Sequence, residues 1–587
     1  MAGGLLNIIA IGNANVFLTG EPTKTFFRVA YCKHTNFGLQ KFRIDFSGTR
    51  DLRLTEPSVF TFKMPRYAEL LMDTYLVMTL PDIWSPIYPP IQARRDSSGL
   101  ITNEGKHTNN KWVPYEFRWI EDLGCQMIQE VEIRCGAFVL ARFSGDYISA
   151  MADRDFTQTK KDALKKMTGN VPELNNPALA YSRHNTYPNA FFDDSNPPTA
   201  GLEPSIRGRN IYVPLNAWFT MDSRCAFPMV ALQYNELEIS ITIRPIQELF
   251  QVRDVLDVAG NHFYPYVQPD FSQDRFQMYR FLQTPLKQYI VNALDDNGKY
   301  PSDSGEYPTY FYGESNPDAY ASRINIWNAD VHLLSTYAFL SKEEAGKFAR
   351  EDQIYMVKEV HKYKYDNIYG TKKVKLETSG MIANWMWYFQ RNDVNMRNEW
   401  SNYSNWPYKN LPTGAQPPPQ ALLINPQDSQ GNTYNTGLFT SGNFNVENRK
   451  EIMETLGILL DGKYRENALP RGVFDYIEKY ARTNGFAQEG IYCYQFCLDT
   501  NPRNYQPSGA INLGKFKNIE LEFVTFTPAI DLTNSNFEVM CSSSGDPIAV
   551  NKSNWRLFEY TYNLTIFEER YNILSFISGN CGMMYAR

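Results

Sequence analysis

The sequence predicts an all-β protein made of two similar domains in tandem. Several segments alternate strictly between apolar and polar residues, the pattern of a strand with one face on a core and one in water. The chain has 587 residues, more than one hydrophobic core usually serves. Two short sequence patterns also recur in the same order in both halves, as tandem copies of one domain would require.

The alternating segments are the first elements that the sequence predicts. Residues 237–244, 519–523 and 558–566 alternate without a break, and residues 72–80 and 131–139 alternate less cleanly. Each is therefore expected to be a half-buried strand. Tyr and Phe number 38 and 37, and flat aromatic rings pack well on pleated sheet. Because the strands lie far apart in sequence, their pairing must be largely non-local, as in a Greek-key sandwich.

The internal repeat consists of two pairs of segments. Met127–Gly136 and Met453–Gly462 share a methionine, a hydrophobic residue six positions later and a glycine nine positions later. Residues 217–237 and 494–519 both run from an aromatic pair through a proline to a strand. The two pairs have different offsets, so insertions must differ between the copies.

Two helices are expected within this β sequence, both decorating the ends of a sandwich. Residues 153–167 contain the lysine pairs 160–161 and 165–166, and Ser341 with Glu344 forms a capping-box pattern that opens a helix to about Phe348. The lysines favour a solvated helix face over a nucleic-acid contact.

Long stretches rich in Pro, Asn, Gly and Ser separate the strands. They exceed ordinary connections, which indicates surface loops with a role of their own. Tryptophans cluster near the first and last of them, either for contacts with other chains or for pinning the loops to their own domains. The stretches are residues 81–114, 169–209, 295–322 and 401–445.

Charge and cysteine usage exclude several classes of protein. With 58 Lys plus Arg against 64 Asp plus Glu the net charge is −6, the wrong sign for direct binding of nucleic acid. The eight cysteines show no CxxC spacing and are expected to be reduced, buried thiols. The N-terminus has no basic leader, and no segment is long and apolar enough to cross a bilayer.

A search for chemistry finds no catalytic, cofactor-binding or metal-binding residues. Nucleotide-binding loops, the GxSxG elbow and the HExxH pair are absent, and the six histidines never have ligand spacing. Cys493 and Cys497 lie four apart, which favours core packing over a metal or redox pair. Three Asn-x-Ser/Thr motifs are candidate glycosylation sites, Asn402, Asn551 and Asn563, of which Asn402 in a long loop is the best.

Four groups of motifs run from the first residues to the last. They comprise Ala2–Leu6, Val16–Gly20, Thr25–Phe27 and Lys33–Phe37; Val213–Leu215, Trp218–Phe219, Ala226–Pro228 and Ala231–Tyr234; Gly490–Tyr492 and Gln506–Asn512; and Tyr571–Leu574 with Ser578–Gly579. In order and spacing they resemble the major capsid proteins of nucleocytoplasmic large DNA viruses, the giant-virus and algal-virus group. The chain departs from that family at Ile8–Gly12, where a Leu-Val-Ala-Tyr-Gly type of run is common.

The resemblance implies two eight-stranded antiparallel jelly-roll sandwiches with long loop insertions and a few short helices. The expected division is an N-terminal arm (1–22), a first jelly roll (23–252), a linker or insertion (253–322) and a second jelly roll (323–587). It also implies a structural protein of the virion shell, made and assembled in the host cytoplasm. This protein would form homotrimeric, pseudo-hexagonal capsomers that meet minor capsid and penton proteins, with an inner viral membrane as a further candidate contact.

Two other readings stay open at this point. A minor shell or scaffold protein would share the fold but occur at low copy number. A jelly-roll protein that binds or cleaves carbohydrate would be a monomer with a concave aromatic and acidic site.

Overall fold

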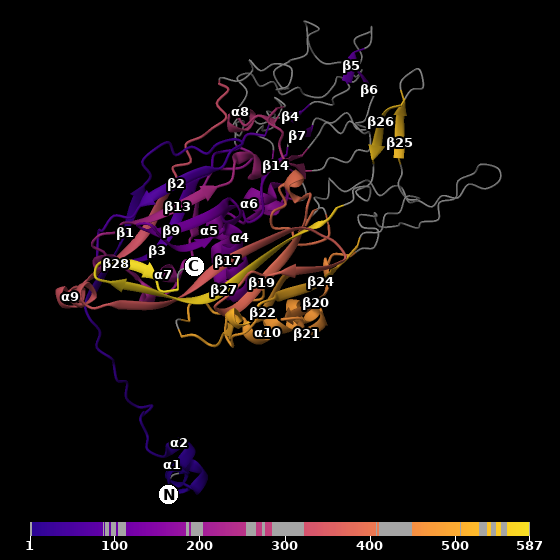
Figure 1. Ribbon diagram of the computed structural model, residues 1–587. Helices are drawn as coiled ribbons and strands as arrows, with labels where there is room; N and C mark the ends of the chain where they lie inside the picture. The colour runs from indigo at the N-terminus through magenta and orange to yellow at the C-terminus, as the bar shows by residue number, and fades with distance from the viewer. Residues whose placement is uncertain are drawn as a thin grey trace.

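Two β-sandwiches stand next to each other in the computed structural model (Figure 1). The structure describes residues 3–585, except for 86, 89–92, 96–100, 104–112, 115, 184–186, 189–203, 254–265, 273–275, 284–321, 407, 410–448, 505, 528–536, 542–546 and 553–559. Nearly all of the expected loop at 295–322 and most of that at 401–445 lie outside the described residues.

The first sandwich consists of two antiparallel sheets with four principal strands each. One sheet has the order β1-β16-β3-β11, with the short strand β12 also paired to β3, and the facing sheet has the order β10-β9-β13-β2. Their bounds are β1 Phe37–Asp45, β2 Ser58–Lys63, β3 Leu70–Thr79, β9 Ile128–Cys135, β10 Phe138–Phe143, β11 Asn210–Pro214, β12 Phe227–Pro228, β13 Leu237–Ile243 and β16 His332–Leu340.

The second sandwich repeats this arrangement. One sheet has the order β17-β27-β19-β22, with β23 and β28 attached at its margins, and the other has the order β18-β24-β20-β21. Their bounds are β17 Gln353–Ile368, β18 Thr371–Lys375, β19 Met381–Arg391, β20 Met453–Leu460, β21 Lys463–Pro470, β22 Ile491–Gln495, β23 Ile511–Asn512, β24 Ile519–Thr525, β27 Tyr562–Ile577 and β28 Asn580–Met583.

The strand order shows that both sandwiches are eight-stranded jelly rolls. Numbered along the chain, the eight principal strands of each sandwich form one sheet in the order 1-8-3-6 and a second sheet in the order 2-7-4-5. The repeat Met127–Gly136 and Met453–Gly462 falls on the fourth strand of each roll, β9 and β20. Its closing glycines both have a left-handed backbone, with φ of 58° and 78°, which a tight turn into the fifth strand requires.

Alternation in the sequence matches alternation in burial. β13 and β24 bury every second residue from end to end, and β13 lies between β2 and β9 with Ile241 opposite both Phe60 and Val131. β27 does not follow the pattern expected for residues 558–566 beyond its first residues. It continues to Ile577 and is largely buried on both faces, because the first sandwich covers its outer face.

Strand β16 completes the first sandwich. It pairs with β1 along its whole length and with β3 on its other side. The sequence-based division placed residues 332–340 in the second jelly roll, yet strand pairing joins them to the first. Residues 244–331 are thus an insertion between the seventh and eighth strands of the first roll, and no alternating pattern in β16 signalled this.

The helices differ from expectation in one place. Instead of one helix over 153–167, α4 ends at Asp155 and α5 begins at Gln158, because Phe156 and Thr157 have an extended backbone. These helices lie at the junction of the two sandwiches, not at an end. The predicted helix after Ser341 is present as α9, and the Ser341 hydroxyl accepts from the backbone N–H of Glu344 at 3.4 Å.

The helix bounds complete the description. They are α1 Gly3–Ile9, α2 Val16–Thr19, α3 Leu123–Gln126, α4 Gly145–Asp155, α5 Gln158–Thr168, α6 Pro172–Asn175, α7 Trp218–Met221, α8 Tyr279–Leu282, α9 Lys342–Arg350 and α10 Glu478–Arg482. Short 3₁₀ turns cover Asn13–Asn15, Pro177–Ser182, Ser223–Cys225, Met229–Ala231, Ile246–Glu248, Val394–Arg397 and Leu513–Lys515, and a π-helical turn, η11, covers Val473–Ile477.

Loop-borne strands from both sandwiches gather at one end of the molecule. In Figure 1, α8, β4 and β7 of the first roll and β25 and β26 of the second all lie in the upper part of the view, away from the N-terminus. The small strands are β4 Ile87–Tyr88, β5 Ala93–Arg95, β6 Ile101–Asn103, β7 Val113–Pro114, β8 Phe117–Trp119, β14 Phe250–Arg253, β15 Tyr266–Val267, β25 Phe537–Cys541 and β26 Pro547–Lys552.

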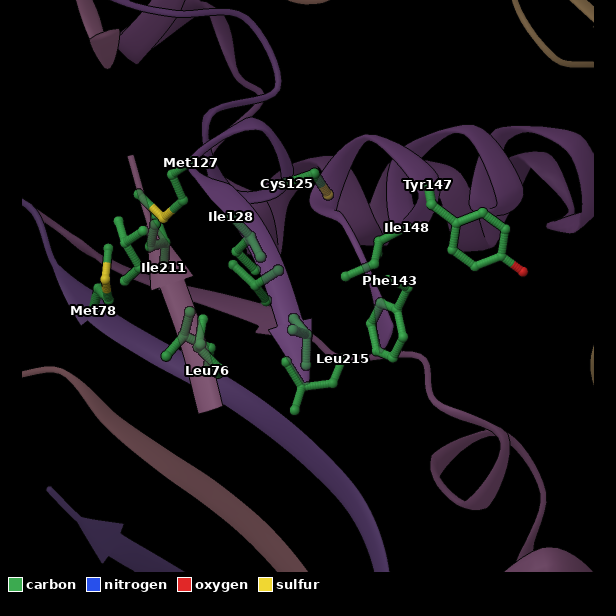
Figure 2. Close-up of a cluster of buried hydrophobic side chains, with 14 of the residues drawn as sticks. Leu76, Met78, Cys125, Met127, Ile128, Phe143, Tyr147, Ile148, Ile211 and Leu215 are labelled. Carbon is green, nitrogen blue, oxygen red and sulfur yellow. The ribbon is translucent and has the colours of Figure 1, made fainter. Parts of the chain in front are cut away.

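One apolar core fills the first sandwich and extends into the junction. Figure 2 shows its centre, where Leu76 of β3 and Ile211 of β11 face Ile128 of β9, and Ile148 reaches in from α4. The same cluster includes Phe567 of the second sandwich. A second core lies wholly within the second sandwich. The two rolls therefore share buried surface, which fixes their relative orientation.

Candidate functional site

The junction between the sandwiches contains a buried polar network. Arg154, at the end of α4, is 1% exposed. Its Nη2 donates to Asp155 Oδ2 and Glu569 Oε1, both at 2.7 Å, and its Nη1 donates to Asn384 Oδ1 at 3.0 Å. Tyr147 donates to the same Glu569 oxygen at 2.9 Å. One helix of the first roll is thereby tied to two strands of the second.

The charges of this network compensate one another. Burial alone would raise the pKa of Glu569, but the Arg154 guanidinium and the hydrogen bond from Asn384 hold it below its usual value. A buried carboxylate that stays ionised beside a buried cation is typical of a structural lock, since either charge alone would be costly to bury.

A second polar contact crosses the junction beside the first. Lys362 Nζ of β17 donates to Asp146 Oδ2 at 2.5 Å and to Ser144 Oγ at 2.9 Å. Tyr388 of β19 also donates to Asp146, at 2.5 Å. Burial would raise the pKa of Asp146, but the Lys362 charge and these hydrogen bonds lower it well below its usual range.

The predicted basic face of α5 is solvated only in part. Lys165 and Lys166 are exposed, whereas Lys161 is buried and its Nζ contacts Asp153 Oδ1 at 3.0 Å and Phe486 O at 2.9 Å. The expectation of a wholly solvated face was therefore wrong for Lys161. Its ammonium lies between the two sandwiches, and no local pattern around Lys161 indicated this neighbour.

A small cavity of about 80 Å³ opens beside the junction. It has room for a few water molecules, and two buried donors at its wall, Asn216 Nδ2 and Trp218 Nε1, have no protein partner. Among the described residues, no three His, Cys, Asp or Glu side chains come together as a metal site would require. In that same part of the chain, no helix is both long and apolar enough to span a membrane.

The N-terminal segment is the most exposed apolar stretch among the residues that the structure describes. From Gly3 to Arg43 no residue is buried, and Figure 1 shows α1 and α2 far from both sandwiches. Phe27 is 99% exposed. Its other exposed apolar residues are Leu5, Leu6, Ile8, Ile9, Ile11, Val16, Phe17, Leu18, Phe26, Val29 and Tyr31. A surface of this kind indicates a contact with another molecule.

A second exposed apolar surface lies on the second sandwich. η11 and α10 connect the fifth and sixth strands, and Phe474 anchors them in the core. On their outer side Ile477 is 59% and Tyr480 89% exposed, with Tyr476 partly exposed beside them.

The three glycosylation motifs lie in different settings. Asn402 is buried, and its Nδ2 donates to Trp406 O at 2.8 Å while its Oδ1 accepts from Ser404. Asn563 is half-buried on β27, and Asn551 lies on β26. A glycan at Asn402 would have to be added before the loop folds. All three sites stay predictions.

The cysteines whose side chains the structure describes are free thiols. Cys125, Cys135, Cys493, Cys497 and Cys581 are buried. Cys32 and Cys225 depart from the expectation, since the first is exposed and the second is half-buried.

Comparison with known proteins agrees with this architecture. Residues 25–279 match the family described as the N-terminus of the major capsid protein, and residues 344–582 match the major capsid protein of large eukaryotic DNA viruses. The major capsid protein of Chrysochromulina ericina virus is 23% identical, and that of Paramecium bursaria Chlorella virus 1 is 20% identical, each over the full length of both chains.

Solved structures give the same result for the fold. The PBCV-1 virus capsid superposes with a TM-score of 0.56 at 17% identity, covering 96% of this chain and all of that one. The Faustovirus major capsid protein superposes with a TM-score of 0.54 at 13% identity, covering 98% of each chain. Two family matches that together span most of the sequence, with relatives aligned from end to end, show that this chain belongs to the major capsid proteins of large eukaryotic DNA viruses.

Proposed function

We propose that the chain is the main structural subunit of an icosahedral virion shell, that it acts by self-assembly and not by catalysis, and that its working unit is a homotrimer. One observation carries the proposal. The second sandwich has a helical connection equivalent to the one that joins the two sandwiches within a chain, and the outer side of this second connection is exposed.

Within the chain, a helix between the fifth and sixth strands makes the junction. In the first sandwich that helix is α4, which packs against the outer face of β19 and β27 through Tyr147 and Arg154. Strand β10, which precedes it, lies against β17. One face of α4 thus packs on the core of its own roll, and the other face packs on the neighbouring roll.

Among the described residues, the equivalent helix of the second sandwich has no second roll packed on its outer side. η11 and α10 occupy the same position between the fifth and sixth strands, and they leave Ile477 and Tyr480 exposed. Pseudo-symmetry between the rolls predicts that these side chains pack on another first sandwich, one supplied by a second copy of the chain.

The first sandwich has a matching open face. In the second roll, the outer face of the sheet that contains β19 and β27 is covered, and Met386 and Phe567 are buried there. In the first roll, the equivalent face exposes Phe37, Leu39 and Tyr212, each more than one third accessible. Each chain therefore carries two open surfaces. One is the helix surface with Ile477 and Tyr480, and the other is this sheet face of the first roll.

Head-to-tail contacts of this kind either close into rings or run on as filaments. Three chains supply six similar sandwiches, the number that a pseudo-hexagonal tile needs. A closed trimer would leave the loop-bearing ends on one side and the N-terminal arms free. This geometry supports a capsomer that tiles the shell of the virion. Synthesis and assembly in the host cytoplasm belong to the same proposal.

The arm supplies a contact between the capsomer and its surroundings. Residues 1–22, continued by the exposed segment that leads to β1 at Phe37, have no core of their own. We infer that they bind neighbouring capsomers or minor capsid and penton proteins, and that they line the inner side of the shell, where a viral membrane would lie.

Light scattering behind a sizing column tests the proposal. The purified chain should have three times the mass of 67.8 kDa, and electron microscopy should show a hexagonal outline. Tyr480→Glu with Ile477→Asp should give a folded monomer, because a carboxylate at each position would be buried in the trimer contact.

A matched control is Tyr234→Glu, since Tyr234 is 74% exposed outside both open surfaces. That variant should remain trimeric. A wild-type chain that stays monomeric at high concentration would contradict the proposal. Low copy number of a trimeric chain in particles would favour the minor shell or scaffold role instead.

A further inference from the structure

Another cavity, of about 290 Å³, opens in the first sandwich. One of its walls is the segment that leads into β11, and the other is formed by α6 and the residues that follow the 3₁₀ turn after it. Its lining includes the guanidinium groups of Arg183, Arg207 and Arg209 and the carboxylate of Glu173. With three cations and one anion, the described lining has a formal charge of +2, although the chain as a whole has a net charge of −6.

The wall segment 204–209 directs two arginines to the same side. It lies antiparallel to the residues that follow β3, and Leu80 N–H donates to Arg209 O at 2.8 Å. A Cβ on Gly208 would stand 2.5 Å from Leu80 O, so Gly208 faces that neighbouring chain segment. Because successive side chains of a strand-like segment point to opposite sides, Arg207 and Arg209 both point away from it, toward the cavity that they line.

The opposite wall positions Arg183. Its Nη1 donates to Pro177 O at 3.3 Å, and its guanidinium lies 5.3 Å from the centre of the Tyr181 ring. Tyr181 and Ser182, just before it, both have a left-handed backbone, with φ of 54° and 63°. Residues other than glycine rarely adopt this conformation, and such strain is concentrated at ligand-binding sites, where the surrounding structure holds it in place.

Two of the three arginines are not engaged in ion pairs within the described part of the chain. Neither Arg183 nor Arg209 pairs with a carboxylate there, and Glu173 pairs with no cation there. Other arginines of the first roll do form such pairs, as Arg53 does with Glu56 at 3.0 Å. Positive charge that is left uncompensated in a partly enclosed cavity attracts an anion.

We propose that this cavity is a binding site for a phosphate dianion, either inorganic phosphate or the phosphate group of a small phosphomonoester. A guanidinium presents its N–H groups in a planar fork that matches phosphate oxygens bidentately, and a charge of −2 balances the described lining. The bound phosphate would connect the two walls by hydrogen bonds. The inference does not depend on trimer formation, because all of these residues belong to one chain.

Isothermal titration calorimetry of the full chain with sodium phosphate tests the site, at pH 8 and constant ionic strength. We expect one saturable site per chain. Arg183→Gln and Arg209→Gln should each raise the Kd about tenfold or more, since a hydrogen bond to a charged group contributes at least that much. The matched control is Arg53→Gln, which removes the same charge from a 66% exposed side chain outside the cavity and should leave the Kd unchanged.

Glu173→Gln gives a prediction of the opposite sign. It removes the one carboxylate of the described lining, so the variant should bind phosphate more tightly than the wild type does. Damage to the fold would instead weaken binding. Sulfate, which is also a dianion, should compete with phosphate, whereas chloride at the same ionic strength should not.

Glycerol phosphate distinguishes the two sources of the phosphate group. Tighter binding of glycerol phosphate would assign the site to phosphomonoesters, and equal or weaker binding would assign it to inorganic phosphate. Absence of saturable phosphate binding by the wild type would overturn the proposal, and so would equal losses of affinity in Arg53→Gln and Arg209→Gln. The wild-type titration and Glu173→Gln decide this even if the arginine variants fold poorly.

Discussion

At the scale of single residues, the junction depends on charges that are removed from water together. Arg154 neutralises two buried carboxylates, those of Asp155 and Glu569. Neither carboxylate has access to solvent, so loss of the guanidinium leaves them without compensation. The free energy of the junction thus depends strongly on this one cation.

Replacing Arg154 with alanine is expected to lower the free energy of unfolding by about 3–5 kcal/mol, the usual result of removing one partner from a buried pair. Chemical denaturation measures the loss. The control is Arg142→Ala, whose side chain is 57% exposed and whose partner Glu132 also contacts Arg134; it should cost about 1 kcal/mol or less. Equal effects of the two substitutions would show that the junction is solvated.

Asp122 gives the fold a pH dependence. Burial, and to a smaller extent the neighbouring Glu121, raise its pKa to about 6, although Ser149 donates a hydrogen bond to it. The folded protein then binds this proton more tightly than the unfolded chain does. Below the unfolded pKa of 3.8 the Asp122 carboxyl does not lower the free energy of unfolding. Above about pH 6 it lowers that free energy by the full amount.

Asp122→Asn should therefore stabilise the protein at pH 8 by up to about 3 kcal/mol, which is the linkage value for a shift of this size. The gain should fall through pH 6 and vanish near pH 4. Asparagine also tolerates the left-handed backbone at this position, where φ is +55°. Unfolding temperatures measured from pH 4 to pH 8 check this; a gain that is the same at every pH would mean that the carboxyl is not the cause.

At the scale of elements, the start of α4 requires glycine. A Cβ at Gly145 would overlap the Cys125 carbonyl oxygen and would lie 2.8 Å from Ile128 O. Both oxygens belong to backbone that is packed in the first core, so neither can move away cheaply.

Gly145→Ala should consequently destabilise the protein by about 3 kcal/mol, at the upper end of overpacking effects, and should loosen the junction that α4 makes. Gly346, inside α9, is the matched control, since its Cβ would meet nothing within 4 Å. Gly346→Ala should stabilise the protein by about 0.5–1 kcal/mol. Denaturation curves of both variants test the pair, and a neutral Gly145→Ala would contradict the packing at the start of α4.

Elements with a one-sided environment were predictable, and those at the junction were not. β13 and β24 alternate between apolar and polar residues because one face of each strand meets water. This period of two can be recognised in the sequence. β27 and α4 are buried on two sides by different domains, so Phe567 and Tyr147 serve contacts that no local period shows. β16 was misassigned for a related reason, because its partners β1 and β3 lie more than 250 residues earlier in the chain.

At the scale of the whole molecule, the two rolls have the same topology but unequal surroundings. The first roll is completed by the second within one chain, while the second roll keeps its outer helix, α10, exposed. Resemblance of motifs predicted the double jelly roll and the shell function. The surfaces that would make the trimer contacts came only from comparing the two connections between the fifth and sixth strands, α4 in the first roll and η11 with α10 in the second.

The N-terminal arm is expected to be needed for assembly beyond the trimer but not for folding. Because no residue from Gly3 to Arg43 is buried, deletion of residues 1–36 removes no core contact, and the unfolding temperature of the remaining chain should stay unchanged. The surfaces around Tyr480 and Leu39 are retained, so the trimer should form as before. Contacts beyond the trimer should be lost, since they need the apolar side chains around Phe17 and Phe27. Sedimentation and electron microscopy of particles from co-expression with the other shell proteins measure this, and complete shells built from the shortened chain would refute the assigned role of the arm.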